Sequence, residues 1–320
     1  MRIYSDQKKT SIAIILAASL LLASGGASAA ARIIFVSDAF QGEMNREYDY
    51  NTGQWRYEWE ITEQSIQEST KIANYVANQI EVSEQVYGMS VDVLTTELNN
   101  ASGSIEEYEN VIEPVWGPLM SHVHGVPGNH DYFTDGAEGY KDFFGVAQTY
   151  NSFTVNSDGM NWNIIGIDSN TDEFTQAEWD AQMSWLTTEV KKEVCTLAYF
   201  HQPRWSNGEH GNNDNTRMQQ LWNILASNGV EMALSGHDHN FEIFHSMDAD
   251  GVPGEGTIQV VSGTGGADLR NISGSQPNSI HQVTDKYGVI DIALYGGAYT
   301  IVMNGPDNGG AFASLYFCHY

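Results

Sequence analysis

The stretch Val230-Glu231-Met232-Ala233-Leu234-Ser235-Gly236-His237-Asp238-His239 places two histidines, two residues apart, in a glycine turn directly after a mostly apolar run. The run predicts a buried strand, so the polar cluster lies in the loop at its end, where a rigid scaffold holds functional side chains. His237 and His239 can then reach neighbouring metal ions. A plain surface turn also uses His and Asp, so this stretch alone favours a metal site only slightly.

Three further clusters each follow a short apolar run: Ser37-Asp38, Gly128-Asn129-His130-Asp131 and Phe200-His201. Asp, Asn and His supply the oxygen and nitrogen donors that divalent first-row metals accept. Taken singly, these residues are ordinary loop, cap or core residues. Their joint occurrence predicts a two-metal phosphoester site, in which cations about 3.5–4 Å apart would clamp the phosphoryl oxygens and acidify a bridging water.

Alternating strand and helix patterns surround these clusters, and the chain has no internal repeat. Strands are expected at residues 32–36, 90–95, 123–126, 162–168, 196–200, 230–235, 257–262, 287–294 and 299–304. Helices are expected at residues 62–87, from Ser104, after Thr175 and around residues 218–225, with capping boxes at Ser104–Glu107 and Thr175–Glu178. This order predicts an α/β fold in which two sheets form a β sandwich flanked by helices.

The first 31 residues have the pattern of a secretory signal peptide. Basic residues open the segment, Ile12 to Leu22 is apolar, and Ala27-Ser28-Ala29 offers small residues for cleavage. The apolar stretch is shorter than the roughly 20 residues that span a bilayer. We therefore expect residues 32–320 to form a single secreted domain, extracellular or periplasmic, without a membrane segment.

The chain is strongly acidic, with 14 basic and 41 acidic residues and a formal net charge of −27. Removal of residues 1–31, which hold Arg2, Lys8, Lys9 and Asp6, leaves 11 basic and 40 acidic residues and a charge of −29. Such a surface repels nucleic acid and anionic membranes, so neither is expected as a partner, and a nuclease is disfavoured. An anionic substrate would need locally bound cations.

These clusters resemble those of the calcineurin-like metallophosphoesterases, and among them the secreted, purple acid phosphatase-like branch. The resemblance covers roughly residues 32–294. Beyond the ligands it includes Ile165-Gly166-Ile167-Asp168-Ser169, His201-Gln202-Pro203-Arg204, Gly208-Glu209-His210-Gly211 and Val261-Ser262-Gly263-Thr264-Gly265-Gly266. It implies a two-sheet sandwich whose ligands lie on loops at one edge, and a phosphorylated small-molecule substrate.

The resemblance also implies a role for each matched residue. Asp38 and His239 would hold the first metal, and Asn129, His201 and His237 the second. His130 would contact the phosphate and assist the leaving group, so that a metal-bound hydroxide hydrolyses phosphomonoesters or phosphodiesters. Arg204 and His210 would border the substrate pocket, although they are also ordinary surface polar residues. Manganese, zinc and iron all suit this donor set.

The chain departs from the family where an Asp bridges the two metals. The matching stretch is Thr95-Thr96-Glu97-Leu98-Asn99-Asn100, in which Glu97 could bridge from a longer arm, whereas another register would put Leu98 there. The tyrosine of the purple enzymes also has no counterpart, since Asn100 or Ala101 falls at its position, so a tyrosinate-coloured iron is not expected. Three outcomes stay open: Glu97 completes the site, only the second metal binds, or the protein is a non-catalytic exported binding or structural protein.

Two further features have more than one interpretation. Cys195 and Cys318 are the only cysteines, and in an exported protein they could form a disulfide or remain buried thiols. Residues 41–87, with Trp55, Tyr57 and Trp59, differ from the family. This segment could be an insertion over the site, a surface for a protein partner, or aromatic core packing, which the composition favours.

Overall fold

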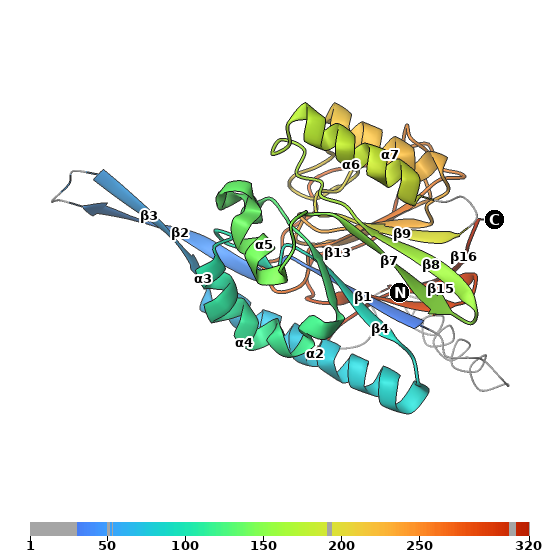
Figure 1. The fold of residues 1–320 in the computed structure, drawn as a ribbon, viewed down its shortest axis with the longest axis horizontal. Coiled ribbons are helices and arrows are strands. Elements are labelled where there is room, and N and C mark those ends of the chain that lie inside the picture. Colours follow the sequence, from blue (N-terminus) through green and yellow to red (C-terminus); the bar gives the residue numbers. More distant parts are fainter. Residues whose placement is uncertain (1–30, 50–51, 53, 191–193, 307–311, 320) are drawn as a thin grey trace, which may run out of the picture.

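The computed structural model describes residues 31–320 except 50–51, 53, 191–193, 307–311 and 320. The predicted signal peptide lies outside the described residues up to residue 30, and the first strand begins at Ala31. Two large sheets lie face to face, with helices on the outer side of each (Figure 1). In the described part of the chain, no helix combines the length and apolarity needed to cross a bilayer.

The first sheet has six strands in the order β16-β15-β14-β1-β4-β6. Strands β1, β4 and β6 run parallel, and β14 joins β1 antiparallel. The bounds are β1 Ala31–Ser37, β4 Val91–Thr96, β6 Val123–Val126, β14 Val289–Tyr295, β15 Ala298–Asn304 and β16 Phe312–Phe317.

The second sheet has seven strands in the order β13-β11-β12-β10-β9-β8-β7. Its central strands β8, β9, β10 and β12 are parallel. The bounds are β7 Asn151–Ser157, β8 Met160–Gly166, β9 Cys195–Tyr199, β10 Met232–Ser235, β11 Phe241–Phe244, β12 Ile258–Ser262 and β13 Ser279–Val283. The predicted strands of both sheets are present, with ends shifted by a few residues.

Three apolar clusters hold these layers together. One lies between the sheets and joins Phe35 and Leu94 to Leu197 and Leu234. The second packs the first sheet against α2 (Glu63–Tyr87) and the helical turns α3 (Ile105–Glu107), η1 (Tyr108–Ile112), α4 (Glu113–Trp116), η2 (Gly117–His122) and α5 (Glu138–Phe144). The third packs the second sheet against α6 (Gln176–Glu189) and α7 (Thr216–Ser227). The predicted sandwich flanked by helices is confirmed.

Local signals in the sequence set the ends of the helices. The Thr62 side chain accepts a hydrogen bond from Ser65 N at the start of α2, and Gly88 ends this helix with φ of 64°. Both predicted capping boxes are formed, Ser104 with Glu107 and Thr175 with Glu178. These bonds satisfy backbone groups that a helix end leaves without partners.

A hairpin of β2 (Phe40–Asp49) and β3 (Gln54–Ile61) extends well beyond the body of the molecule (Figure 1). These strands were not predicted, although Trp55, Tyr57, Trp59 and Ile61 alternate with charged residues at the period of a strand. A short strand, β5 (Asn99–Asn100), pairs with the base of β2. The hairpin therefore begins directly beside the loop that carries Glu97.

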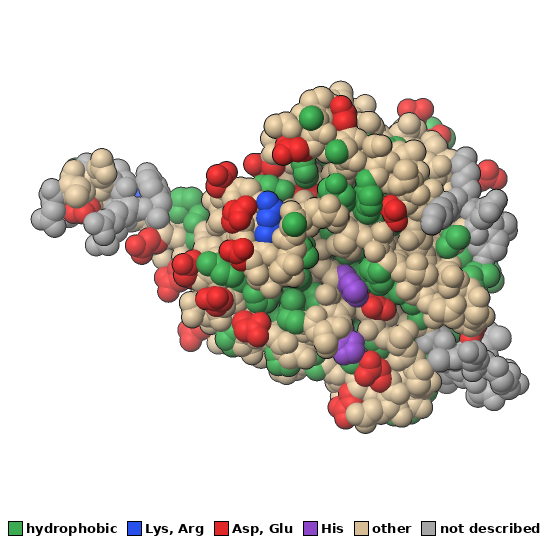
Figure 2. Space-filling model, viewed as in Figure 1, with side chains coloured by type: hydrophobic (Ala, Val, Ile, Leu, Met, Phe, Trp, Pro, Cys, Tyr) green, Lys and Arg blue, Asp and Glu red, His purple; other side chains and the backbone are tan. Residues whose placement is uncertain are grey.

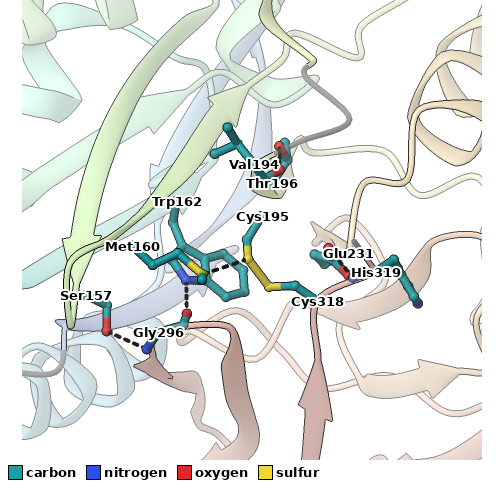
Figure 3. The surroundings of a disulfide bond; sticks show 10 residues. All are labelled: Ser157, Met160, Trp162, Val194, Cys195, Thr196, Glu231, Gly296, Cys318 and His319. Atoms are coloured by element: carbon teal, nitrogen blue, oxygen red, sulfur yellow. Dashed lines mark hydrogen bonds and ion pairs between the residues drawn. A yellow bond between two sulfur atoms is a disulfide. The ribbon is translucent and has the colours of Figure 1, made fainter. Parts of the chain in front are cut away.

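Cys195 and Cys318 form a disulfide, so the bonded alternative is the one found. Their Cα atoms lie 5.7 Å apart, and the bond joins the start of β9 to the segment after β16. Met160, Trp162 and Glu231 surround it (Figure 3). The C-terminal segment is thus tied to the core of the second sheet.

Candidate metal centre

The residues predicted to bind metal lie in loops at the carboxyl ends of parallel strands from both sheets. Asp38 follows β1, Glu97 follows β4, and Asn129 lies three residues after β6. His201 lies two residues after β9 and His237 two after β10. Because these strand ends meet at one edge of the sandwich, residues distant in sequence converge there.

His201 is at the centre of one group of donors. Its Nε2 lies 3.0 Å from Asn129 Oδ1 and 3.2 Å from His237 Nδ1. The same nitrogen lies 3.4 Å from Glu97 Oε2. The ring is fully buried, and Thr96 Oγ1 lies 3.4 Å from its other nitrogen, Nδ1. These are the residues that the resemblance assigns to the second metal.

Asp38 and His239 form a second group beside the first. His239 Nε2 lies 3.4 Å from Asp38 Oδ1, and this oxygen is buried without a hydrogen-bond partner. The other oxygen of Asp38 accepts from Ser37 Oγ at 2.6 Å and from the backbone N of His237 at 3.0 Å. The His239 ring is oriented by the Asp268 carbonyl, 2.9 Å from its Nδ1.

Glu97 lies between the two groups. Ligand atoms of Asp38, Glu97 and His201 all lie within 4.8 Å of one another. Glu97 Oε1 accepts from the backbone N of His130 at 2.7 Å, which fixes the carboxylate in place. The longer side chain therefore brings its carboxylate to the position between the groups, which is where the resemblance expects the bridging Asp.

Asn100 is a further candidate ligand that the sequence did not identify. Its Nδ2 donates to Glu97 Oε2 at 2.7 Å and lies 3.5 Å from His239 Nε2. Its Oδ1 is buried and lacks a hydrogen-bond partner. The spacing of three residues after Glu97 was the available signal, since Asn100 falls where the purple enzymes have tyrosine.

The backbone is strained at three of these positions. Asp38, Glu97 and His237 have φ of 55°, 50° and 70°, in the left-handed region that residues other than glycine rarely adopt. Such conformations cost on the order of 1–3 kcal/mol and concentrate at functional sites. Here they turn each side chain toward the shared edge of the sandwich.

Two glycines allow the loops to approach so closely. A Cβ atom at Gly128 would lie 2.3 Å from Glu97 Oε1, and one at Gly236 would lie 2.3 Å from Asp38 Oδ2. Any larger residue would displace these carboxylates. The glycines that precede Asn129 and His237 are therefore part of the geometry of the centre.

Burial controls protonation at this site. It lowers the pKa of His201 to about 4 and that of His237 well below 6.5, so both rings are neutral and able to bind cations. Burial would raise the pKa of Asp38, but His239 and His201 outweigh it and lower that pKa. Burial, with repulsion from Asp38 and Asp131, raises the pKa of Glu97. Two carboxylates this close ionise together only where cations neutralise them.

His130 lies next to the metal candidates. Its Nδ1 is 2.8 Å from the Ala101 carbonyl, so this nitrogen carries a proton and donates, leaving Nε2 for another partner. The neighbouring Asp131 holds the loop: it accepts from Tyr108 OH at 2.6 Å and from Gly128 N at 2.8 Å. The two side chains of this motif therefore differ in role, since one stabilises the loop and the other borders the site.

The structure separates the two residues predicted to border the substrate pocket. The His210 ring stacks on His237 with centroids 4.0 Å apart, and Arg270 NH1 lies 2.6 Å from its Nε2. Arg270, which the sequence did not single out, thus brings a cation to the site. Arg204 instead binds Asp214 at 2.6 Å and lies 3.9 Å over the Trp205 ring. Its role in substrate binding stays a prediction.

The donor set fits a pair of cations. Among the described residues, buried oxygens of Asp38 and Asn100 have no hydrogen-bond partner, and the rings of His201 and His237 nearby are neutral. An unpartnered buried polar atom is costly unless something binds it. Oxygen and imidazole ligands suit manganese, zinc and iron alike.

Comparisons with known proteins concern the family and the fold. The family model described as calcineurin-like phosphoesterase matches residues 92–241, a range that holds all the candidate ligands except Asp38. Tartrate-resistant acid phosphatase type 5 of Homo sapiens is 38% identical over 73 residues, which is 22% of this chain and 22% of the human enzyme. The match thus spans about a fifth of that relative.

Two solved structures share the fold over most of this chain. GAP50, described as the anchor in the inner membrane complex of Plasmodium, has a TM-score of 0.66 at 14% identity, covering 92% of this chain and 90% of its own. Purple acid phosphatase PPD1 of yellow lupin, Lupinus luteus, has a TM-score of 0.63 at 14% identity, covering 90% of this chain and 54% of its own. Identities this low establish the common fold only.

Proposed function

Since this chain is related to the calcineurin-like phosphoesterases through residues 92–241, we propose that it is a metal-dependent hydrolase of phosphomonoesters or phosphodiesters with a dinuclear site. The observation that carries the proposal is the convergence of Asp38, Glu97 and His201, with the unpartnered oxygen of Asp38 between His239 and Glu97. A structural role alone does not explain why a buried oxygen is left without a partner.

We assign the chain's own residues as follows. Asp38, His239 and Asn100 would hold one cation, Asn129, His201 and His237 the other, and Glu97 would contact both. When bound, the metals would acidify water and neutralise charge on the phosphoryl oxygens. His130, whose Nδ1–H is held by the Ala101 carbonyl, would serve the leaving oxygen through Nε2.

The cations would also resolve an electrostatic problem. Asp and Glu side chains are spread over the face seen in Figure 2, whereas Lys and Arg side chains occupy little of it. A chain with a formal charge of −27 repels a phosphate ester. Neutral Asn and His ligands leave the site net positive when two divalent ions are bound to two carboxylates. Arg270 adds a cation beside His210.

A second candidate function is a non-catalytic exported protein that uses this fold for binding. Glu97 in place of the bridging Asp, and the absence of the tyrosine, favour it over an unmodified enzyme. GAP50 has the same fold and is described as an anchor, so the fold by itself does not imply turnover. A phosphorylated small molecule is the proposed ligand in either case, and export follows from the predicted signal peptide.

Elemental analysis and hydrolysis assays test the proposal. We expect two metals per chain after growth with manganese, zinc and iron, and chelator-sensitive hydrolysis of a phosphomonoester. His201→Ala and His237→Ala should each lose the second metal and lower kcat by roughly 100-fold or more, because the clamp on the phosphoryl group is broken.

His245→Ala is the matched control, since His245 is exposed beyond β11, and it should keep both metals and full activity. Activity retained in both His201→Ala and His237→Ala would refute the proposal. Absence of metal and of turnover in the unmodified chain would favour the non-catalytic protein. One metal per chain would locate the defect at Asp38 and His239.

A further inference from the structure

The β2–β3 hairpin has two chemically different faces. Opposite residues of an antiparallel pair share a face, and the faces alternate along each strand. One face holds Met44 opposite Trp59, with Tyr48 farther out on the same side of the strand. The other holds Glu43–Glu60, Asn45–Glu58 and Asp49–Gln54. Among the side chains that the structure describes, the aromatic ones of the hairpin therefore share one face and the acidic ones the other.

The base of this hairpin forms part of the wall of the metal centre. Phe40 and Gln41 pair with Asn99 and Asn100, which follow Glu97. A Cβ atom at Gly42 would lie 2.4 Å from the Cβ of Ala101, so the glycine lets β2 rest directly on the loop whose carbonyl binds His130. The face of the hairpin that carries Trp59 therefore reaches the metal centre at the base of the hairpin.

Trp59 lies at that place and contacts His130. Their ring centroids are 5.5 Å apart in an edge-to-face arrangement. Phe133 stacks on Trp59 with centroids 5.4 Å apart and lies 4.6 Å from His130. Trp59 also packs against the core beneath α2, which holds its ring in position. Two aromatic rings therefore flank the residue assigned to the leaving oxygen.

Trp59 and Phe133 expose apolar surface beside the polar metal centre. Phe133 is 55% exposed, which is a large fraction for an aromatic residue. A large exposed aromatic side chain next to convergent polar groups is typical of ligand sites. Aromatic core packing, the interpretation favoured for residues 41–87, accounts for the buried part of Trp59, whereas Phe133 lies outside that segment and is exposed.

We propose that Trp59 and Phe133 form a subsite for the leaving group, which selects phosphomonoesters whose leaving group is an aromatic ring. The inference rests on the proposed hydrolysis. In that reaction a water oxygen bonds to phosphorus, the bond from phosphorus to the leaving oxygen breaks, and the leaving oxygen takes a proton. A ring attached to that oxygen lies beside His130, where both aromatic side chains can stack on it.

The test compares kcat/KM for phenyl phosphate and glycerol 2-phosphate across variants. A general loss of activity lowers kcat/KM for both substrates, so the ratio of the two values reports mainly the change in preference between them. Trp59→Ala and Phe133→Ala should each lower the ratio by roughly tenfold, beyond any loss of activity that the two substrates share. Trp59→Phe should restore most of the preference, because a ring is retained.

Tyr48→Ala is the matched control. Tyr48 lies on the same face of the hairpin, four residues farther out than Met44, the partner of Trp59. That spacing is roughly 13 Å along a strand. Tyr48→Ala should leave the ratio unchanged. A ratio unaltered in both Trp59→Ala and Phe133→Ala, or an equal loss for both substrates, would overturn the inference.

A binding measurement separates this inference from the proposed function. Calorimetry on manganese-loaded protein compares phenylphosphonate with methylphosphonate, neither of which needs to be hydrolysed. Tighter binding of phenylphosphonate that is lost in Trp59→Ala supports the subsite even if no ester is turned over, in which case only the proposed hydrolysis fails. Equal affinity for the two phosphonates would overturn the subsite.

Discussion

Several residues at the metal centre have backbone conformations or close contacts that reduce the stability of the fold. Asp38, Glu97 and His237 adopt positive φ, and Gly128 and Gly236 stand where a side chain would displace a carboxylate. Each of these costs stability, so the surrounding packing must hold them in place. The same packing buries charged groups elsewhere near the centre, and those groups make stability depend on pH.

Asp168 provides a test at this scale. Its carboxylate is buried and accepts from Tyr132 OH at 2.6 Å and from Asn170 N at 3.0 Å. Burial raises the pKa of Asp168 above 3.8, more than these bonds lower it. The unfolded chain therefore loses this proton at a lower pH than the folded chain does. Between the two pKa values, the free energy of unfolding should fall as pH rises, by up to about 1.4 kcal/mol per pH unit.

Asp168→Asn should reduce this slope, as measured by urea unfolding at several pH values above 3.8, while Asp131 and Glu97, whose pKa values burial also raises, keep their contributions. The exposed Asp142→Asn on α5 is the control and should keep the slope of the unmodified chain. A slope that is the same in Asp168→Asn and in the unmodified chain would show that Asp168 does not hold a proton.

Elements differ in how closely their sequence determines them. Helix α2 has an N-cap at Thr62, apolar residues on one face and a glycine stop at Gly88, so its ends follow from local interactions. The β2–β3 hairpin lacks such signals. Its strands are defined by pairing with each other and, at the base, with β5. Its position beside Glu97 is what turns Trp59 toward His130.

The cap of α2 can be tested directly. Thr62→Ala removes the acceptor for Ser65 N and should lower the free energy of unfolding by about 1 kcal/mol. Chemical denaturation gives this value. Thr70→Ala, in the interior of the same helix, is the control and should change stability by less than about 0.5 kcal/mol, because alanine is the better helix former. Equal effects would mean that Thr62 does not act as a cap.

At the scale of the whole molecule, two sheets converge on one edge and the disulfide lies at the far end of a central strand. β9 starts at Cys195 and runs toward His201, so the bond and the metal centre are separated by the length of this strand. The bond closes a loop with a sequence separation of 123. Removal of the disulfide should therefore lower stability without changing catalysis.

Replacement of both cysteines tests this separation. Cys195→Ala with Cys318→Ala should lower the free energy of unfolding by about 2–4 kcal/mol, since the unfolded chain gains conformational entropy. Metal content and kcat/KM should stay within about twofold. Reductant should lower the stability of the unmodified chain and leave the double variant unchanged. Loss of metal in the folded double variant would contradict the separation.

The sequence by itself determined the fold class, the ends of the capped helices and the loops that carry the candidate ligands. It could do so because periodicity, caps and polar clusters after apolar runs are local properties. The predicted positions of Asp38, Asn129, His201, His237 and His239 meet at one edge, as the order of strands requires.

Only the tertiary structure decided the rest, because it depends on groups that are far apart in the chain. Whether Glu97 could reach across to His201 depended on the register of β4 against β1 and on the absence of a side chain at Gly128. Arg270 has no local signal, and Asn100 has only its spacing after Glu97; both join the site through the loops that approach it. Trp59 likewise joins the site through tertiary structure, since it contacts His130 because the hairpin pairs with the strand after Glu97.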